Sequence, residues 1–335
     1  MLNRIMAKRR SKPGKKVLFF IFFISLVLVN VFAEDNIKTN GQVPDPDSAD
    51  AGPLGDDSLN KDYRQKLQRV VAEAEEELPQ DWETYTRFMP ASGAKSQSGK
   101  VSVVDTASEY NYTIKAFGKL PVEFGLATKY IAINNKTAIK LPAHLTTVGF
   151  GMETTLPLFE IDKTYITIGI TPLFSSDNWN FNSSSFCLHQ RYFLIRQQSE
   201  KLVFIAGVDV YPGQQDEYYP ILGFIYKPDE RLTFTIIPDH PEISYLVNEK
   251  LTVFIEGGGS SDEFNVKKED LKNVALTYDE MHAGCGLRYK WNKHLKGSLS
   301  CGSVFNRSIA YDQDSLGKVA LENGFYTEFR FEVSI

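Results

Sequence analysis

The sequence predicts an all-β protein, an antiparallel up-and-down β-barrel of about 12 strands, with 10 or 14 as the alternative even numbers, on three observations. Residues 218–258 read as a meander of short apolar runs that are broken by turn residues. Two longer hairpins, 186–211 and 281–307, alternate apolar with polar side chains. Residues 325–335 form an amphipathic strand on which the sequence ends. Period-two alternation bounded by Pro, Asp, Asn and Gly is typical of strands with two different faces.

Residues 1–33 are predicted to be a secretory signal peptide. Seven of the 37 Lys and Arg residues lie there, without any acidic residue, and an apolar run follows over 17–31. Ala33 provides the small residue of a cleavage site. A membrane span needs roughly 20 apolar residues, so we expect cleavage after Ala33 and treat an uncleaved anchor as the alternative.

Residues 34–60 are predicted to be a disordered acidic linker, because they are rich in Asp, Pro and Gly and hold few large apolar residues. Asp45, Asp47 and Asp56 match three positions of a calcium-binding loop, but Asp50 stands where its turn glycine belongs. A solvated linker is therefore the favoured interpretation.

Residues 61–99 are predicted to form a short helix and a connector. Apolar residues recur at helical spacing over 62–78, and Pro79 follows. Trp82, Tyr85 and Phe88 could anchor the connector on the rest of the fold. The β-barrel domain is expected to occupy residues 100–335.

The alternation in this last domain has two explanations. In a soluble β-sandwich the apolar side of each strand faces a shared core. In a membrane barrel it faces lipid, and the strands are about 9–11 residues long. Several segments reach that length, and the strand over 325–335 carries alternating aromatic residues. We therefore favour the membrane barrel.

The signal peptide, the meander and the final strand together resemble an uncharacterised family of bacterial outer-membrane β-barrel proteins. The segments that carry the resemblance are 219–224 (YPILGF), 232–238 and 243–245 (ISY). Ile335 departs from the family's usual terminal Phe. The resemblance implies a fold and a location in the cell outer membrane, and it transfers no catalytic or ligand residue.

Composition argues against two classes of function. Beyond position 33 the chain has 30 basic and 42 acidic residues, and the basic residues form no cluster. This disfavours nucleic acid as a partner. No phosphate-binding glycine loop, zinc-helix histidine pair or Cys-x-x-Cys occurs. Gly257-Gly258-Gly259 is interpreted as a loop. We therefore expect no enzyme, no cofactor and no metal site.

Charged residues on the polar sides of the strands are expected to line the barrel interior. They are Glu123, Lys129, Glu153, Arg288, Lys290, Glu328 and Arg330. Their mixed signs define no ion preference.

Two weaker site hypotheses remain. His189, near Ser183–Ser185, is the only candidate for a lipid-hydrolysing site. If residues 292–294 form the turn of a hairpin, Cys285 lies opposite Cys301, and export would permit a disulfide between them.

The favoured function is an exported outer-membrane barrel of structural or channel type. Its expected partners are outer-membrane lipid and the barrel-assembly machinery, and the sequence sets no oligomeric state. The alternatives are a soluble exported β-sandwich that binds a polysaccharide or a protein, and a lipid-modifying barrel enzyme.

Overall fold

A computed structural model describes residues 80–334, apart from 96, 117–119, 159–160, 162, 178, 180–182, 215–216, 239, 269–270 and 313–315. The predicted signal peptide, the acidic linker with Asp45, Asp47 and Asp56, and the helix over 62–78 lie outside the described residues. No helix in the described part of the chain is long and apolar enough to cross a membrane.

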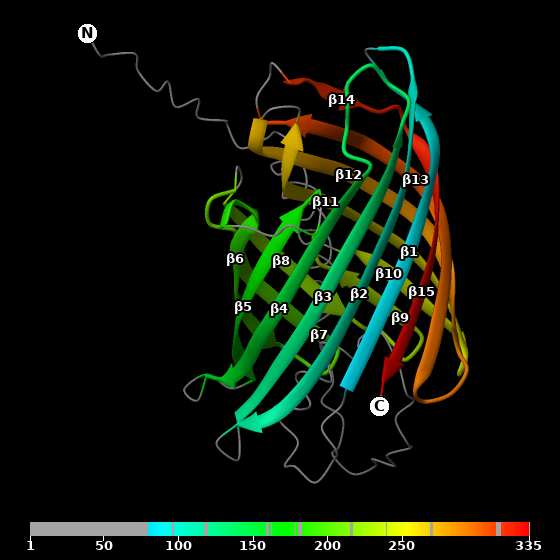
Figure 1. The fold of residues 1–335 in the computed structure, drawn as a ribbon. Helices are drawn as coiled ribbons and strands as arrows, with labels where there is room; N and C mark the ends of the chain where they lie inside the picture. The colour runs from blue at the N-terminus through cyan, green and yellow to red at the C-terminus, as the bar shows by residue number, and fades with distance from the viewer. Residues whose placement is uncertain are drawn as a thin grey trace, which may run out of the picture. The chain divides into compact units, whose positions relative to one another are not determined.

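The described residues form fifteen strands and one 3-10 turn (Figure 1). In chain order these are β1 (Gln80–Gly93), β2 (Lys100–Ala116), β3 (Leu120–Asn135), β4 (His144–Pro157), β5 (Thr164–Ser176), η1 (Ser183–Ser185), β6 (Phe186–Gln197), β7 (Leu202–Val210), β8 (Tyr218–Tyr226), β9 (Leu232–Ile236), β10 (Glu242–Asn248), β11 (Leu251–Lys268), β12 (Leu271–Lys290), β13 (Leu295–Tyr311), β14 (Lys318–Ala320) and β15 (Gly324–Ser334).

The strands close into an antiparallel barrel. Each strand from β1 to β13 pairs with the next, β13 pairs with β15, and β15 pairs with β1. The short strand β14 attaches only to β13, so 14 strands form the wall and one lies outside it. The predicted all-β barrel is confirmed, but about 12 strands was too few. The first strand of the barrel, β1, was missed because its residues were assigned to the connector. The described barrel begins at Gln80 and not at residue 100.

The predicted hairpins have the expected strands and register. β6 pairs with β7, and β12 pairs with β13 so that Cys285 faces Cys301. The interpretation of Gly257-Gly258-Gly259 as a loop was wrong. These glycines lie inside β11, where they face Ala283, His282 and Met281 of β12. The long neighbouring strand supplies a partner for each residue, which outweighs the low strand propensity of glycine.

Three tight turns between neighbouring strands share one capping device. The side-chain oxygens of Asp229, Asn248 and Asn292 each accept hydrogen bonds from the backbone N–H groups two and three residues ahead. Such turns fix the register of the strands that they join. The N–H groups of Leu232 and Arg231 also lower the pKa of Asp229 below its ordinary value. We call this end of the barrel the turn end and the end that carries β14 the loop end.

The wall is not uniform around the barrel. β9 and β10 are short, so β8 pairs with β9 only at 224–226, and β11 pairs with β10 only up to Glu256. Farther toward the loop end, β11 reaches the end of β5, where Asn265 pairs with Ser176. Residues 218–223 of β8 and 258–264 of β11 therefore lack a paired described strand on one side, and we call this sector the notch.

The outer surface of the wall is strongly apolar. Large apolar side chains are exposed on nearly every strand, among them Trp82, Phe124, Leu126, Phe150, Leu222, Ile243, Ile255, Leu287, Leu299 and Phe329. They alternate along their strands with buried residues. Inward-facing side chains pack into two apolar clusters. One, at the loop end, includes Val103, Ile131, Phe264 and Leu276; the other, toward the turn end, includes Phe193, Ile205 and Ile225.

Candidate functional site: a charged network inside the barrel

Buried charged side chains occupy the barrel interior between the two apolar clusters. Arg87 of β1 lies at their centre. Successive side chains of a strand point to opposite faces, and Thr86 and Phe88 on either side of Arg87 are exposed, so Arg87 faces the interior. Its Nε donates to Oε2 of Glu328 at 2.8 Å, and its Nη1 donates to Oε1 of Glu280 at 2.8 Å. The side chains of both carboxylates are at most 3% exposed. One cation thus holds together two acidic residues from β15 and β12.

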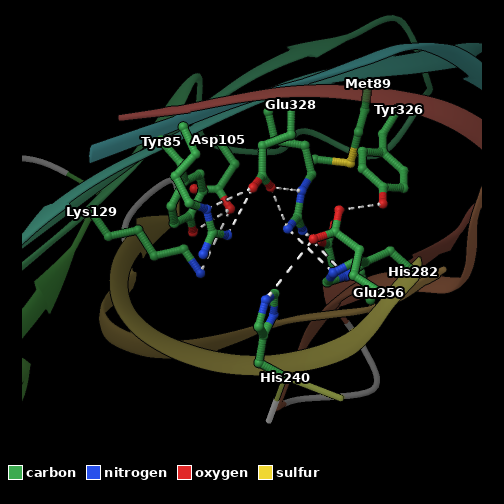
Figure 2. A network of polar contacts seen from close by, with 12 residues as sticks. Tyr85, Met89, Asp105, Lys129, His240, Glu256, His282, Tyr326 and Glu328 are labelled. Atoms are coloured by element: carbon green, nitrogen blue, oxygen red, sulfur yellow. Dashed lines mark hydrogen bonds and ion pairs between the residues drawn. The ribbon is translucent and has the colours of Figure 1, made fainter. Parts of the chain in front are cut away.

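Arg330 and Tyr326, both on β15, extend this network. Arg330 donates to Glu328 at 2.7 Å and to the half-exposed Glu83 at 3.0 Å. The Tyr326 hydroxyl donates to Glu256 of β11 at 3.0 Å. Figure 2 shows Glu328, Glu256 and the rings of His240 and His282 converging in this part of the barrel. Buried charges are stable only when they are paired in this way.

A second group of charges joins β3 to β11 inside the barrel. Lys129 on β3 bonds Asp262 on β11 at 2.7 Å and lies 3.8 Å from Asp105. The Tyr85 hydroxyl donates to Asp105 at 3.2 Å. Close to Asp262, β11 pairs with the end of β5 through Asn265 and Ser176, so only β4 and β5 lie between β3 and β11 at this level. The Lys129–Asp262 contact therefore joins two strands that are not neighbours in the wall.

The residues that were predicted to line the interior all lie on the less exposed side of their strands. Arg288 forms an ion pair with Glu242 at 2.8 Å and stacks on Phe254. Glu123 and Glu153 face each other across β3 and β4, and Lys290 faces Lys296 across β12 and β13. The structure joins Glu328 to Arg330 but places Lys129 in the separate group with Asp262. Whether these residues line a conducting path stays a prediction.

Sequence reasoning missed Arg87, Glu280, Glu256 and Asp105. Arg87 fell in the predicted connector. Glu280 lies two residues before His282, on the same side of β12, so extending the alternation of that strand would have found it. Which charges meet across the barrel depends on the curvature of the wall, and a single sequence does not encode that directly.

His189 has partners of its own. Its Nε2 lies 3.2 Å from Asp209, which also accepts a hydrogen bond from Arg191, and its ring stacks on Tyr211 at 4.3 Å between centroids. These contacts hold the imidazole between β6 and β7. Nowhere in the described ranges do three or more His, Cys, Asp or Glu side chains gather as metal ligands do.

Cys285 and Cys301 lie opposite each other on the exposed side of β12 and β13, and both are free thiols in the structure. The disulfide between them stays a prediction. If it forms during export, mass spectrometry after alkylation without reduction will find the peptides of Cys285 and Cys301 unmodified, whereas Cys187 reacts. Full alkylation of both residues in freshly isolated protein would contradict the bond.

Comparisons with known proteins give one family and several distant structures. No curated protein matches the chain. The chain resembles an outer membrane channel of Pseudomonas putida F1, at 9% identity and a TM-score of 0.42, covering 88% of this chain and 100% of that one. It also resembles a Pseudomonas aeruginosa FadL homologue, at 9% identity and a TM-score of 0.43, covering 77% and 89%.

A family model matches residues 119–335. The matched range includes every strand from β3 to β15 and leaves out β1 and β2. The chain therefore belongs to the family described as a domain of unknown function, DUF6268.

Proposed function

We propose that the protein is an outer-membrane β-barrel of channel type whose passage is closed at mid-height by ion pairs. The observation that carries this proposal is the contact between Lys129 and Asp262, which joins the non-neighbouring strands β3 and β11 inside the barrel. Any solute that moves along the barrel axis must pass this contact and the neighbouring Arg87 network.

The apolar outer surface supports the membrane location. Soluble monomers rarely expose contiguous apolar patches larger than a few hundred Å². Here exposed residues such as Leu126 and Phe150 are direct cross-strand neighbours, and the pattern recurs on most of the wall. A closed barrel also satisfies its backbone groups in lipid. The soluble β-sandwich accounts less well for this surface. Export through the predicted signal peptide and insertion by the barrel-assembly machinery belong to the same proposal.

The buried interior supports a closed passage over an open pore. Apolar side chains from non-neighbouring strands meet at the loop end, where Ile131 of β3 and Phe264 of β11 belong to one cluster and are at most 1% exposed. Channels can close through apolar constrictions and rings of charge. Opening would require β11 to move away from β3, which separates Lys129 from Asp262 as well.

The variant Asp262→Ala tests this closure. It removes the contact between β3 and β11 but leaves Lys129 next to Asp105, so the fold keeps a partner for the buried cation. In planar bilayers we expect the wild type to conduct rarely and Asp262→Ala to show a several-fold higher open probability.

The matched control is Asp279→Ala on β12. Asp279 bonds Ser261 and Ser308 away from the interior network, so its removal should leave conductance unchanged. A wild-type protein that forms a wide, constantly open pore would contradict the closed passage. Silence of both the wild type and Asp262→Ala would leave a structural role.

The lipid-modifying alternative needs a serine activated by His189. In the structure the imidazole pairs with Asp209 and stacks on Tyr211. An aspartate also orients the histidine of hydrolases, so a lipid-hydrolysis assay is the test of this alternative.

A further inference from the structure

The guanidinium of Arg307 differs from every other charged group described so far. Arg307 is 1% exposed, and none of its three side-chain nitrogens has a hydrogen-bond partner among the described residues. Arg87 and Arg288 are also buried, and the Arg330 side chain is only 16% exposed, but each pairs with a carboxylate. A buried cation without a partner is strongly unfavourable, because it has lost its hydration and gained nothing in return.

A distortion of the wall places Arg307 in this position. The register between β12 and β13 shifts so that Asp279 faces Ser308 while Met281 faces Phe305. Asn306 and Arg307 therefore both stand opposite Glu280, and Asn306 adopts a positive φ of 52°. Such bulges redirect side chains and occur often beside functional sites. Here Asn306 is exposed and Arg307 points into the barrel.

Buried apolar side chains lie close to Arg307. Val304 lies next to the point where a side chain at Gly324 would begin, Leu321 donates its backbone N–H to the Arg307 carbonyl, and both residues are at most 1% exposed. A carbon placed on Gly324 would lie 3.7 Å from Nη1 of Arg307 and 2.6 Å from Oγ of Ser92. The absence of a side chain at Gly324 thus lets the Ser92 hydroxyl and the guanidinium approach the same point.

The nearby acidic groups are engaged elsewhere. The Glu280 carboxylate accepts hydrogen bonds from Arg87 and from the Tyr278 hydroxyl. Glu322 is exposed and lies against Gly93. Neither forms an ion pair with Arg307 within the described part of the chain.

We infer that Arg307 and Ser92 form a buried binding site for a small carboxylate anion at the loop end of the barrel. The planar fork of a guanidinium matches two carboxylate oxygens, and the Ser92 hydroxyl, whose bond to the Pro90 carbonyl is long at 3.5 Å, would turn to the anion as a third donor. The tight packing around the site admits only a small anion. The site is separate from the Lys129–Asp262 contact, so this inference does not depend on the channel proposal.

Formate and pivalate provide the test, because both are monovalent carboxylates and differ in size. The full chain in detergent is melted in equal concentrations of each sodium salt. Formate should raise the melting temperature saturably, by about 5 °C at a hundredfold excess over its dissociation constant, and pivalate should not. Arg307→Met should abolish this difference. If that variant fails to fold, Ser92→Ala should still shift half-saturation to higher formate concentration.

Two further variants sharpen the result. Arg231→Met removes an exposed arginine at a tight turn and should keep the full response to formate. If Glu322 neutralises Arg307 in solution, formate will not raise the melting temperature of the wild type but will raise that of Glu322→Gln. This result would overturn the inference. Equal effects of the two salts on the wild type, or a formate response that survives in Arg307→Met, would overturn it as well.

Discussion

Replacement of Phe150 by arginine is expected to destabilise the folded barrel by about 2–4 kcal/mol, the cost of a basic side chain on the lipid face near the bilayer midplane. Phe150 lies midway along β4, is 58% exposed and neighbours Leu126 of β3. The measurement is urea unfolding of the barrel in lipid vesicles, followed by the change in gel mobility between folded and boiled protein.

The location of the substituted residue decides the size of this effect. Trp291→Arg at the turn end should cost only about 0–1 kcal/mol, because it lies near the membrane interface. Phe150→Leu keeps an apolar side chain and should change little. If the wall instead faced water, Phe150→Arg would alter stability by at most about 0.5 kcal/mol. That result, with the protein in the soluble periplasmic fraction, would favour the β-sandwich.

Replacement of Arg87 by methionine should have the largest effect inside the barrel. Methionine fills a similar volume but leaves Glu280 without its arginine partner and Glu328 with only Arg330. Loss of one partner from a buried ion pair costs about 3–5 kcal/mol. Urea unfolding in vesicles should show a loss of this size.

Glu83→Gln is the matched control, because Glu83 bonds the same network through Arg330 but its side chain is 45% exposed. An exposed pair of this kind contributes about 0–1 kcal/mol. The double variant Arg87→Met with Glu280→Gln should recover part of the loss, since it removes one unpaired charge. A loss no larger for Arg87→Met than for Glu83→Gln would show that the interior is hydrated.

The sequence was sufficient to predict the barrel, because its wall follows local rules. Alternation with period two and the turn residues Asp229, Asn248 and Asn292 specify the hairpins, including the pairing of Cys285 with Cys301. It was insufficient for the number of strands. β1 lies in a segment whose aromatic residues suggested an anchor, so it was not counted as a strand.

The candidate site was predictable only in part, for a related reason. Alternation along one strand indicates that Lys129 or Arg330 points inward, but not which charge it will meet. Asp262 reaches Lys129 because β11 leaves β10 after Glu256 and crosses to β5. The inward position of Arg307 depends on a bulge, and in the sequence Asn306 and Arg307 resemble any two strand residues.

The notch between β8 and β11 gives the barrel a distinct side. Along 218–223 and 258–264 neither strand pairs with a further described strand on one side. Hydrocarbon cannot satisfy unpaired backbone groups, so any that this sector presents to the membrane need lipid headgroups, water or protein as partners. The outer wall of the barrel is therefore not the same on all sides. A neighbouring protein in the membrane would meet a different surface at this sector than on the rest of the wall.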